Sequence, residues 1–112
     1  MGNISFGRIT VAAAGTPQRL TSNQVNPGAV LLVHALLIQP HPANTGRVYI
    51  GIGAAFVKSG AGQIAWLAVP GTNVSPAFSE TVSYAQNAVE ASEIYIDVDN
   101  NGDSVIGSGI IA

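Results

Sequence analysis

The sequence predicts an all-β fold, a single-domain antiparallel β-sandwich or jelly-roll-like barrel of about eight short strands. Turn-forming Gly, Pro, Asn and Asp recur along the chain, and short runs rich in Val, Ile, Tyr and Thr lie between them. Evenly spaced short strands with turn signals between them are typical of sandwiches and barrels. The length of 112 residues corresponds to one domain. Residues 1–7 are the candidate for a flexible N-terminal arm.

The expected strands are the segments between these turns: 3–13, 17–23, 29–39, 47–57, 63–69, 75–84, 91–98 and 104–111. Apolar and polar residues alternate most clearly in EIYIDVD, where Ile94, Ile96 and Val98 share one side of the strand. Alternation of this kind predicts a buried set and an outward set. The buried set is Val11, Leu32, Val48, Ile50, Ile94, Ile96 and Val98, and the outward set is Arg47, Glu93 and Asp97.

One apolar segment, NPGAVLLVHALLIQP (26–40), is compatible with a helix or with a strand. Pro27 suits the first position of a helix. Gly28 and the β-branched residues Val30 and Val33 disfavour a helix, and the all-β context favours a central strand. We therefore expect a strand here, and at most one short helical turn within 83–92.

Charge is the unusual feature of the composition. Only 9% of the residues are charged, compared with about 25% in an ordinary domain. Depletion of charge is typical of the buried centre of protein interfaces, so we expect much of the surface to contact partner proteins. The net charge of −2 without a basic cluster disfavours nucleic-acid binding. The longest apolar run, residues 29–38, has about half the length of a membrane span.

The few charges are divided along the chain. Every Lys and Arg precedes residue 60, and every Asp and Glu follows residue 79. Arg19 or Arg47 of one copy could therefore pair with Glu90 or Glu93 of the next copy across a ring-closing contact. Pairing within one chain is the alternative.

No residue set points to catalysis or to a cofactor. The chain has no cysteine, and His34 and His41 have no nearby carboxylate with metal-ligand spacing. No nucleophile elbow or phosphate-binding loop is present. We therefore expect a protein that is not an enzyme and binds no cofactor.

The segment DVDNNGDS (97–104) raises the question of calcium. Asp97, Asp99, Asn101 and Asp103 fill positions 1, 3, 5 and 7 of a calcium loop of the EF-hand type. Position 12 is Ser108, where such a loop needs a bidentate Glu, and the flanking residues resemble strands. We predict a hairpin loop between strands 91–98 and 104–111 without a required metal; a weak calcium site is the alternative.

The single tryptophan, Trp66, lies in the run QIAWLAV and is expected in the core. An exposed Trp could instead stack on a sugar ring. This possibility retains a carbohydrate-binding module as a less favoured alternative.

Four segments follow one another with distinctive turns: ITVAAAGTPQRLTS (9–22), LLIQPHPANTGRVYIG (36–51), LAVPGTNVS (67–75) and EASEIYIDVDNNGDSVI (90–106). Together they resemble small β-domain virion proteins of tailed bacteriophages. The resemblance spans residues 9–106 and depends on turns and strand edges, not on a catalytic signature. It includes head decoration (cement) proteins as well as tail and fibre accessory proteins.

The resemblance implies a structural role on the capsid surface of a virion. A cement protein of this kind binds and stabilises the shell, so the expected partner is the major capsid protein and the expected state is a homotrimer. Uncharged hydrogen-bonding surfaces suit this role, because they are less costly to desolvate than charges. A tail, baseplate or fibre accessory module is the alternative.

Overall fold

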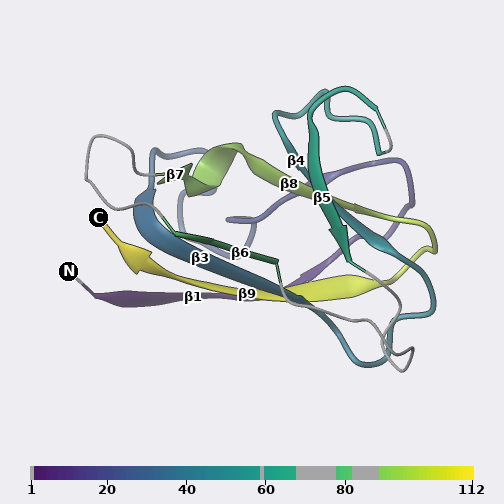
Figure 1. Ribbon diagram of the computed structural model, residues 1–112, viewed down its shortest axis with the longest axis horizontal. Helices are drawn as coiled ribbons and strands as arrows, with labels where there is room; N and C mark the ends of the chain where they lie inside the picture. Colours follow the sequence, from purple (N-terminus) through teal and green to yellow (C-terminus); the bar gives the residue numbers. More distant parts are fainter. Residues whose placement is uncertain (1, 59, 68–77, 82–88) are drawn as a thin grey trace.

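The computed structural model describes residues 2–58, 60–67, 78–81 and 89–112, and in these residues two antiparallel sheets pack face to face (Figure 1). A 3₁₀ turn, Ala91–Glu93, directly precedes β8. The strands are β1 (Asn3–Thr10), β2 (Gln18–Arg19), β3 (Leu32–Pro40), β4 (Val48–Ile52), β5 (Gln63–Leu67), β6 (Phe78–Thr81), β7 (Val89–Glu90), β8 (Ile94–Val98) and β9 (Ser104–Ile111).

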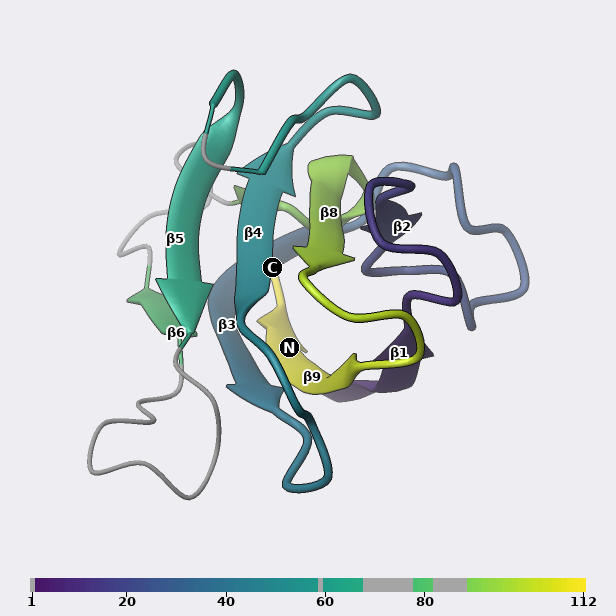
Figure 2. The same cartoon turned by 90° about the vertical axis from the view of Figure 1, so that its right-hand side faces the viewer.

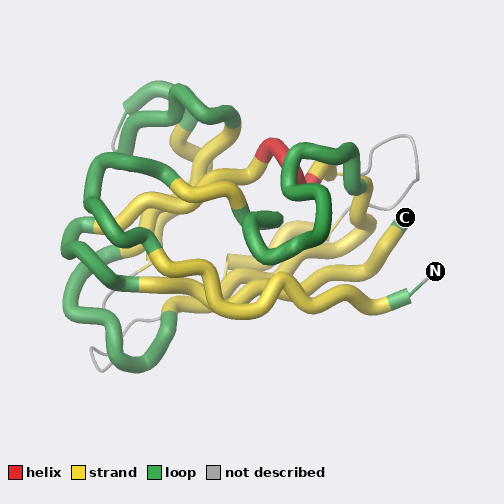
Figure 3. Tube along the Cα trace, turned by 180° about the vertical axis from the view of Figure 1, so that it is seen from behind, coloured by secondary structure: helices red, strands yellow, loops and turns green. Residues whose placement is uncertain are grey.

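The chain passes repeatedly from one sheet to the other. Sheet A has the order β1-β9-β3-β6, with β7 also paired to β3, and sheet B has the order β2-β8-β4-β5. Figure 2 shows β5, β4 and β8 side by side, with β3, β9 and β1 beneath them. In Figure 3 the connections between the two layers are long loops, and β1 and β9 bring the two ends of the chain together. The predicted all-β sandwich is confirmed, and the described strands do not close into a barrel.

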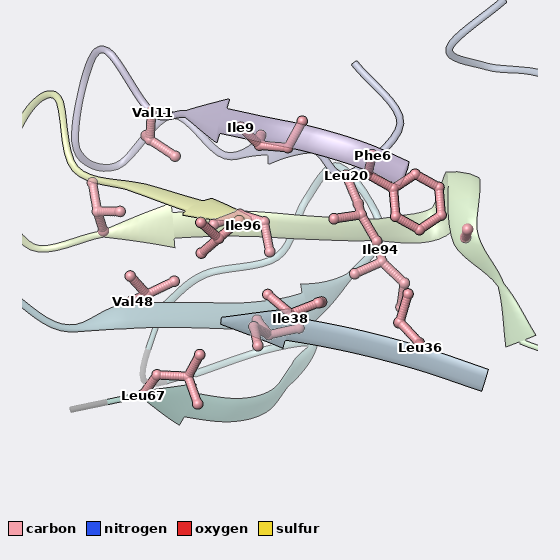
Figure 4. Close-up of a cluster of buried hydrophobic side chains, with 14 of the residues drawn as sticks. Phe6, Ile9, Val11, Leu20, Leu36, Ile38, Val48, Leu67, Ile94 and Ile96 are labelled. Carbon is pink, nitrogen blue, oxygen red and sulfur yellow. The ribbon is translucent and has the colours of Figure 1, made fainter. Parts of the chain in front are cut away.

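The core lies between the two sheets and consists mainly of aliphatic side chains (Figure 4). Phe6 and Ile9 of β1 and Ile38 of β3 approach it from sheet A, while Val48 of β4 and Ile96 of β8 approach it from sheet B. Each of these five side chains is at most 2% exposed. Burial of each such side chain stabilises a fold by about 1.5–3 kcal/mol.

Strand β9 has two glycines, Gly107 and Gly109, on the core side, next to the buried Val105. Gly107 lies below Phe6 and Leu20, where an added Cβ would come within 3.0 Å of Leu20 Cδ1 and 3.4 Å of Phe6 Cβ. At Gly109 a Cβ would lie 2.8 Å from the carbonyl oxygen of Ala35. The two glycines therefore make room for the large side chains of the core, and the isoleucines of β9 occupy other positions.

The core prediction is confirmed for six of the seven residues and wrong for Leu32, which is 42% exposed. A register shift between Val33 and Ala35 interrupts the alternation of β3. Val33 therefore takes the inward position before the shift, and Leu36 and Ile38 take it afterwards. The strand prediction for this segment is confirmed over Leu32–Pro40, while residues 26–29 form turns and bends and residues 30–31 have no regular structure.

Other boundaries differ from the expected ones. Residues 3–7 are not a free arm, because they belong to β1 and pair with β9. Strand 17–23 is reduced to Gln18–Arg19, and strand 91–98 begins only at Ile94, after the 3₁₀ turn. The predicted strand 75–84 is described only over β6, Phe78–Thr81. The predicted helical turn in 83–92 overlaps the 3₁₀ turn at residues 91–92. Residues 75–77 and 82–88 lie outside the described residues. No helix of the described residues has the length and apolar character needed to cross a membrane.

The hairpin prediction for 99–103 is wrong. Strand β8 pairs with β2 and β4 in sheet B, whereas β9 pairs with β1 and β3 in sheet A. The loop therefore crosses from one sheet to the other, and it is held by Val11, whose carbonyl accepts a 2.8 Å hydrogen bond from Gly102 N. Gly102 has a φ of 87°, which explains why glycine occupies this position.

Candidate functional site

Asp97, the first residue of the acidic segment, is buried with 1% of its surface exposed. Its Oδ1 accepts hydrogen bonds from Gly15 N at 2.9 Å and from Val98 N at 2.8 Å. The predicted exposure of Asp97 is therefore wrong, although its strand register is right. The reason is that the loop carrying Gly15 lies over this side of β8 and takes the carboxylate as an acceptor.

Asp103 holds a different loop. Its carboxylate accepts hydrogen bonds from Gly46 N at 2.8 Å and from Thr45 N at 3.1 Å, and only 6% of the residue is exposed. Asn44, in the same loop, bonds both backbone groups of Ser104, at 2.7 Å and 2.8 Å. This part of the acidic segment therefore fixes the connection that leads into β4.

The remaining two residues of the calcium pattern have further partners. Asn101 Oδ1 accepts a hydrogen bond from Ala14 N at 2.8 Å. Asp99 accepts a hydrogen bond from the Tyr49 hydroxyl at 3.2 Å and forms an ion pair with Lys58 at 3.6 Å. Asp97 and Asn101 thus hold the same loop, at Gly15 and Ala14, while Asp103 holds the loop before β4. No three His, Asp or Glu side chains of the described residues form a metal-binding group.

The histidines are equally separate. His34 is half-buried on β3. His41 lies in the loop after β3, where its Nδ1 accepts a hydrogen bond from Ala43 N at 3.1 Å. The backbone N–H of His41 donates a 3.0 Å hydrogen bond to the carbonyl of Ser104, at the end of the acidic segment. Among the described residues, however, neither histidine belongs to a group of three or more possible metal ligands.

The four residues predicted at an interface occupy different parts of the surface. Arg19 Nε donates to the Tyr95 hydroxyl at 3.0 Å, and Arg47 lies with its guanidinium carbon 4.4 Å from the centre of the Trp66 ring. Glu90 accepts a hydrogen bond from Ser92, and Glu93 is exposed in the 3₁₀ turn. Among the described residues the ion pair is Lys58–Asp99, so these arginines and glutamates do not pair within one chain there. Their pairing between copies stays a prediction.

The open edge of β1 is covered by side chains. Asn23 Nδ2 donates to the carbonyl oxygens of Phe6 and Arg8 at 3.1 Å and 3.0 Å, next to a register shift between Ser5 and Gly7. Unpaired strand edges are sites where another strand can add, and a bulge with a capping side chain blocks this addition. Outer sheet faces are therefore better candidates for partner contact than this edge.

The outer face of sheet A is apolar and nearly uncharged. Leu37, Ile106 and Ile110 are 38, 41 and 37% exposed. Between β3 and β9 this face has a shallow hollow lined by Leu37, Ile110, Gly109 and Asn3, among others. Strands β1, β3 and β9, which make up most of this face, together contain one Lys or Arg, which is Arg8, and no Asp or Glu. The short strand β7 adds Glu90 opposite Leu32, at one end of β3. We call this surface the apolar face.

The outer face of sheet B is aromatic and charged. Tyr49, Phe56 and Tyr95 form a small buried cluster there, with Phe56 lying over Gly51. Trp66, on the edge strand β5, is opposite Tyr49 and is 48% exposed. The prediction of Trp66 in the core is therefore wrong: Ala65 and Leu67 occupy the inward positions of β5.

The exposure of the apolar residues of β9 is not among the predictions from sequence, although the residue pattern of this strand indicates it. In SVIGSGII the residues with even numbers from 106 to 110 are Ile, Ser and Ile, and those between them are Gly. Alternation of this kind gives a strand one side of large residues and one side without side chains. An assumption that the larger set faces the core fails here, because Phe6 fills the space above the glycines.

Comparison of the chain with models of known protein families and with curated protein sequences finds no match. The function is therefore inferred from the surfaces themselves.

Proposed function

We propose that this chain is a structural virion protein of a tailed bacteriophage, a head decoration or cement protein that binds the major capsid protein and stabilises the shell. The apolar face of sheet A carries this proposal. It is the surface through which the protein contacts the shell, and the aromatic face of sheet B points away from it. The resemblance of the turn pattern to small virion β-domains supports the same role.

The composition of the apolar face suits a permanent contact. Leu37, Ile106 and Ile110 supply apolar area, and Ser108 and Asn3 supply uncharged hydrogen-bonding groups beside them. Such groups lose less hydration free energy on burial than charges do. Because β1, β3 and β9 contain no Asp or Glu, contact through these three strands buries no carboxylate of their own.

The size of the face supports several copies acting together. An eight-residue strand is about 26 Å long, and three strands at about 4.8 Å spacing give a flat area of roughly 400 Å². A stable interface usually buries about 800 Å² on each partner. One copy would therefore bind weakly, and a homotrimer that presents three such faces would gain affinity through multivalency.

The test uses shells of a phage whose genome encodes the chain, prepared without the protein and then mixed with purified protein. We expect saturable binding of many copies per shell and a higher temperature of shell disruption. Light scattering of the purified protein measures the predicted trimer. Mass spectrometry of intact virions measures the copy number.

Two matched variants locate the contact. Ile106→Asp places a charge on the apolar face, and Ile64→Asp does the same on β5, at nearly the same exposure (41 and 42%). Shell binding should fall at least tenfold for the first variant, since burying an unpaired charge is costly, and should be unchanged for the second. Presence of only a few copies at the tail would instead favour a tail, baseplate or fibre accessory module.

A further inference from the structure

Sheet B has a group of aromatic and polar side chains on its outer side. Arg47, which immediately precedes β4, and Tyr49 on β4 face the same way, because Val48 between them is in the core. Trp66 of β5 is the direct neighbour of Tyr49 in the sheet. Asp99 follows β8 and accepts the hydrogen bond of the Tyr49 hydroxyl. Segments from three parts of the chain thus form one surface.

Trp66 and Arg47 are the accessible members of this surface. The Trp66 side chain is about half exposed on an edge strand, and the guanidinium of Arg47 stacks over its ring at 4.4 Å. An exposed cation–π contact stabilises by about 0.5–1 kcal/mol, enough to orient the guanidinium beside the indole. No carboxylate of the described residues lies within ion-pair distance of Arg47. With respect to the part of the chain that the structure describes, its planar set of N–H donors is therefore available to an anion.

Hydrogen-bonding groups lie next to this pair. The Asp99 carboxylate contacts both the Tyr49 hydroxyl at 3.2 Å and Lys58 Nζ at 3.6 Å. Asn100 donates to the Thr45 hydroxyl at 3.0 Å on the exposed side of the same region. A ring platform with fixed polar groups around it suits a ligand that is apolar on one side and rich in hydroxyl groups at its edge.

We propose that Trp66 and Arg47 form a binding site for a carboxylated sugar, such as a uronic acid residue of an acidic polysaccharide. The pyranose ring stacks on the exposed part of the indole, and the sugar carboxylate accepts two hydrogen bonds from the guanidinium. Asp99 and Asn100 are the partners available for hydroxyl groups. The proposal does not depend on the role of the chain in a virion.

The charges of the surface distinguish this ligand from nucleic acid. Nucleic-acid binding requires several phosphate contacts along a basic surface. Here one open guanidinium lies beside an acidic segment, and the chain has a net charge of −2. A single carboxylate on a sugar ring matches one guanidinium beside one ring.

The chain offers a direct probe, because Trp66 is its only tryptophan. Titration with tetragalacturonate, oligomannuronate or a hyaluronan tetrasaccharide should give a saturable change in intrinsic fluorescence for at least one of them. The methyl ester of that sugar keeps the ring and loses the charge, so it should bind about tenfold more weakly or worse. Dextran sulfate, a polyanion without carboxylates, serves as the control for unspecific charge attraction.

Calorimetry on variants separates the two contributions. Trp66→Ala and Arg47→Gln should each weaken binding of the acidic sugar at least tenfold, and Arg47→Gln should also abolish the preference over the ester. Ile64→Ala, on the same strand, and Arg8→Gln, on sheet A, are the matched controls and should bind normally. Equal binding of acid and ester, equal binding of dextran sulfate, or no binding of any acidic sugar up to about 10 mM would overturn the proposal. None of these results affects the shell-binding test, which uses Ile106→Asp.

Discussion

Replacement of Asp103 by alanine should destabilise the protein strongly, although Asp103 lies in a loop. In the structure its carboxylate is the acceptor for the backbone N–H groups of Thr45 and Gly46, at distances of 3.1 Å and 2.8 Å. The residue is 6% exposed, so water has little access to these donors. Alanine would leave both donors without their partner.

The magnitude follows from these two donors. A buried polar group that loses its hydrogen-bond partner costs about 1–3 kcal/mol. Asp103→Ala leaves two such groups, but it also removes the cost of burying a carboxylate. The expected loss in free energy of unfolding is therefore about 2–5 kcal/mol. That loss is a large part of the 5–15 kcal/mol that typically stabilises a domain. Asp103→Asn keeps one acceptor oxygen and should lie between alanine and the wild type.

Equilibrium unfolding in urea, followed by Trp66 fluorescence, measures this loss directly. Asp99→Ala is the matched control from the same segment. The Asp99–Lys58 ion pair is 3.6 Å long between side chains that are 40 and 29% exposed, so its removal should cost about 1 kcal/mol or less. A loss below about 0.5 kcal/mol for Asp103→Ala, or equal losses for the two variants, would refute the reasoning.

Three further predictions concern the core, the glycines and metal binding. Ile96→Ala should cost about 2–5 kcal/mol in urea unfolding, and a cost below about 0.5 kcal/mol would contradict its place in the core. Gly109→Ala should lower the free energy of unfolding by about 1–3 kcal/mol, because its Cβ would meet the Ala35 carbonyl oxygen. Gly60→Ala is the control: Gly60 has space for a Cβ, so this variant should stay within about 0.5 kcal/mol of wild type. The midpoint of thermal unfolding should be the same with calcium and with chelator, because the carboxylates of residues 97–103 already bind backbone or side-chain partners. A rise of several degrees with calcium would instead show that the folded protein binds calcium.

The β fold and much of its interior could be predicted from alternation within single strands. Ile94, Ile96 and Val98 were expected on one side of a strand, and all three are in the core. Val48 and Ile50 follow the same rule on β4. Alternation has this power because neighbouring residues of a strand point to opposite sides of the sheet, whatever the strand pairs with. The exception, Leu32, lies just before a register shift, which alternation along the chain does not reveal.

The surfaces proposed for binding could be predicted only in part. The low charge content indicated contact with partners, but not that Ile106 and Ile110 would form an outer face. That arrangement depends on Phe6, which comes from the other end of the chain and fills the space above Gly107 and Gly109. Trp66 was expected inside because its neighbours are apolar, and its exposure follows from the inward direction of Ala65 and Leu67 on an edge strand.

The sequence by itself determined the fold class and the inward sides of β4 and β8. Only the tertiary structure decided that 99–103 crosses between sheets and that Asp97 is buried. Both depend on pairing between distant segments: Gly15 and Asp97 are 82 residues apart, and β8 and β9 belong to different sheets. The local sequence pattern predicts on which side of a strand a residue lies. The solvent exposure of that side depends on which loop packs over it, and the packing of loops is a property of the whole fold.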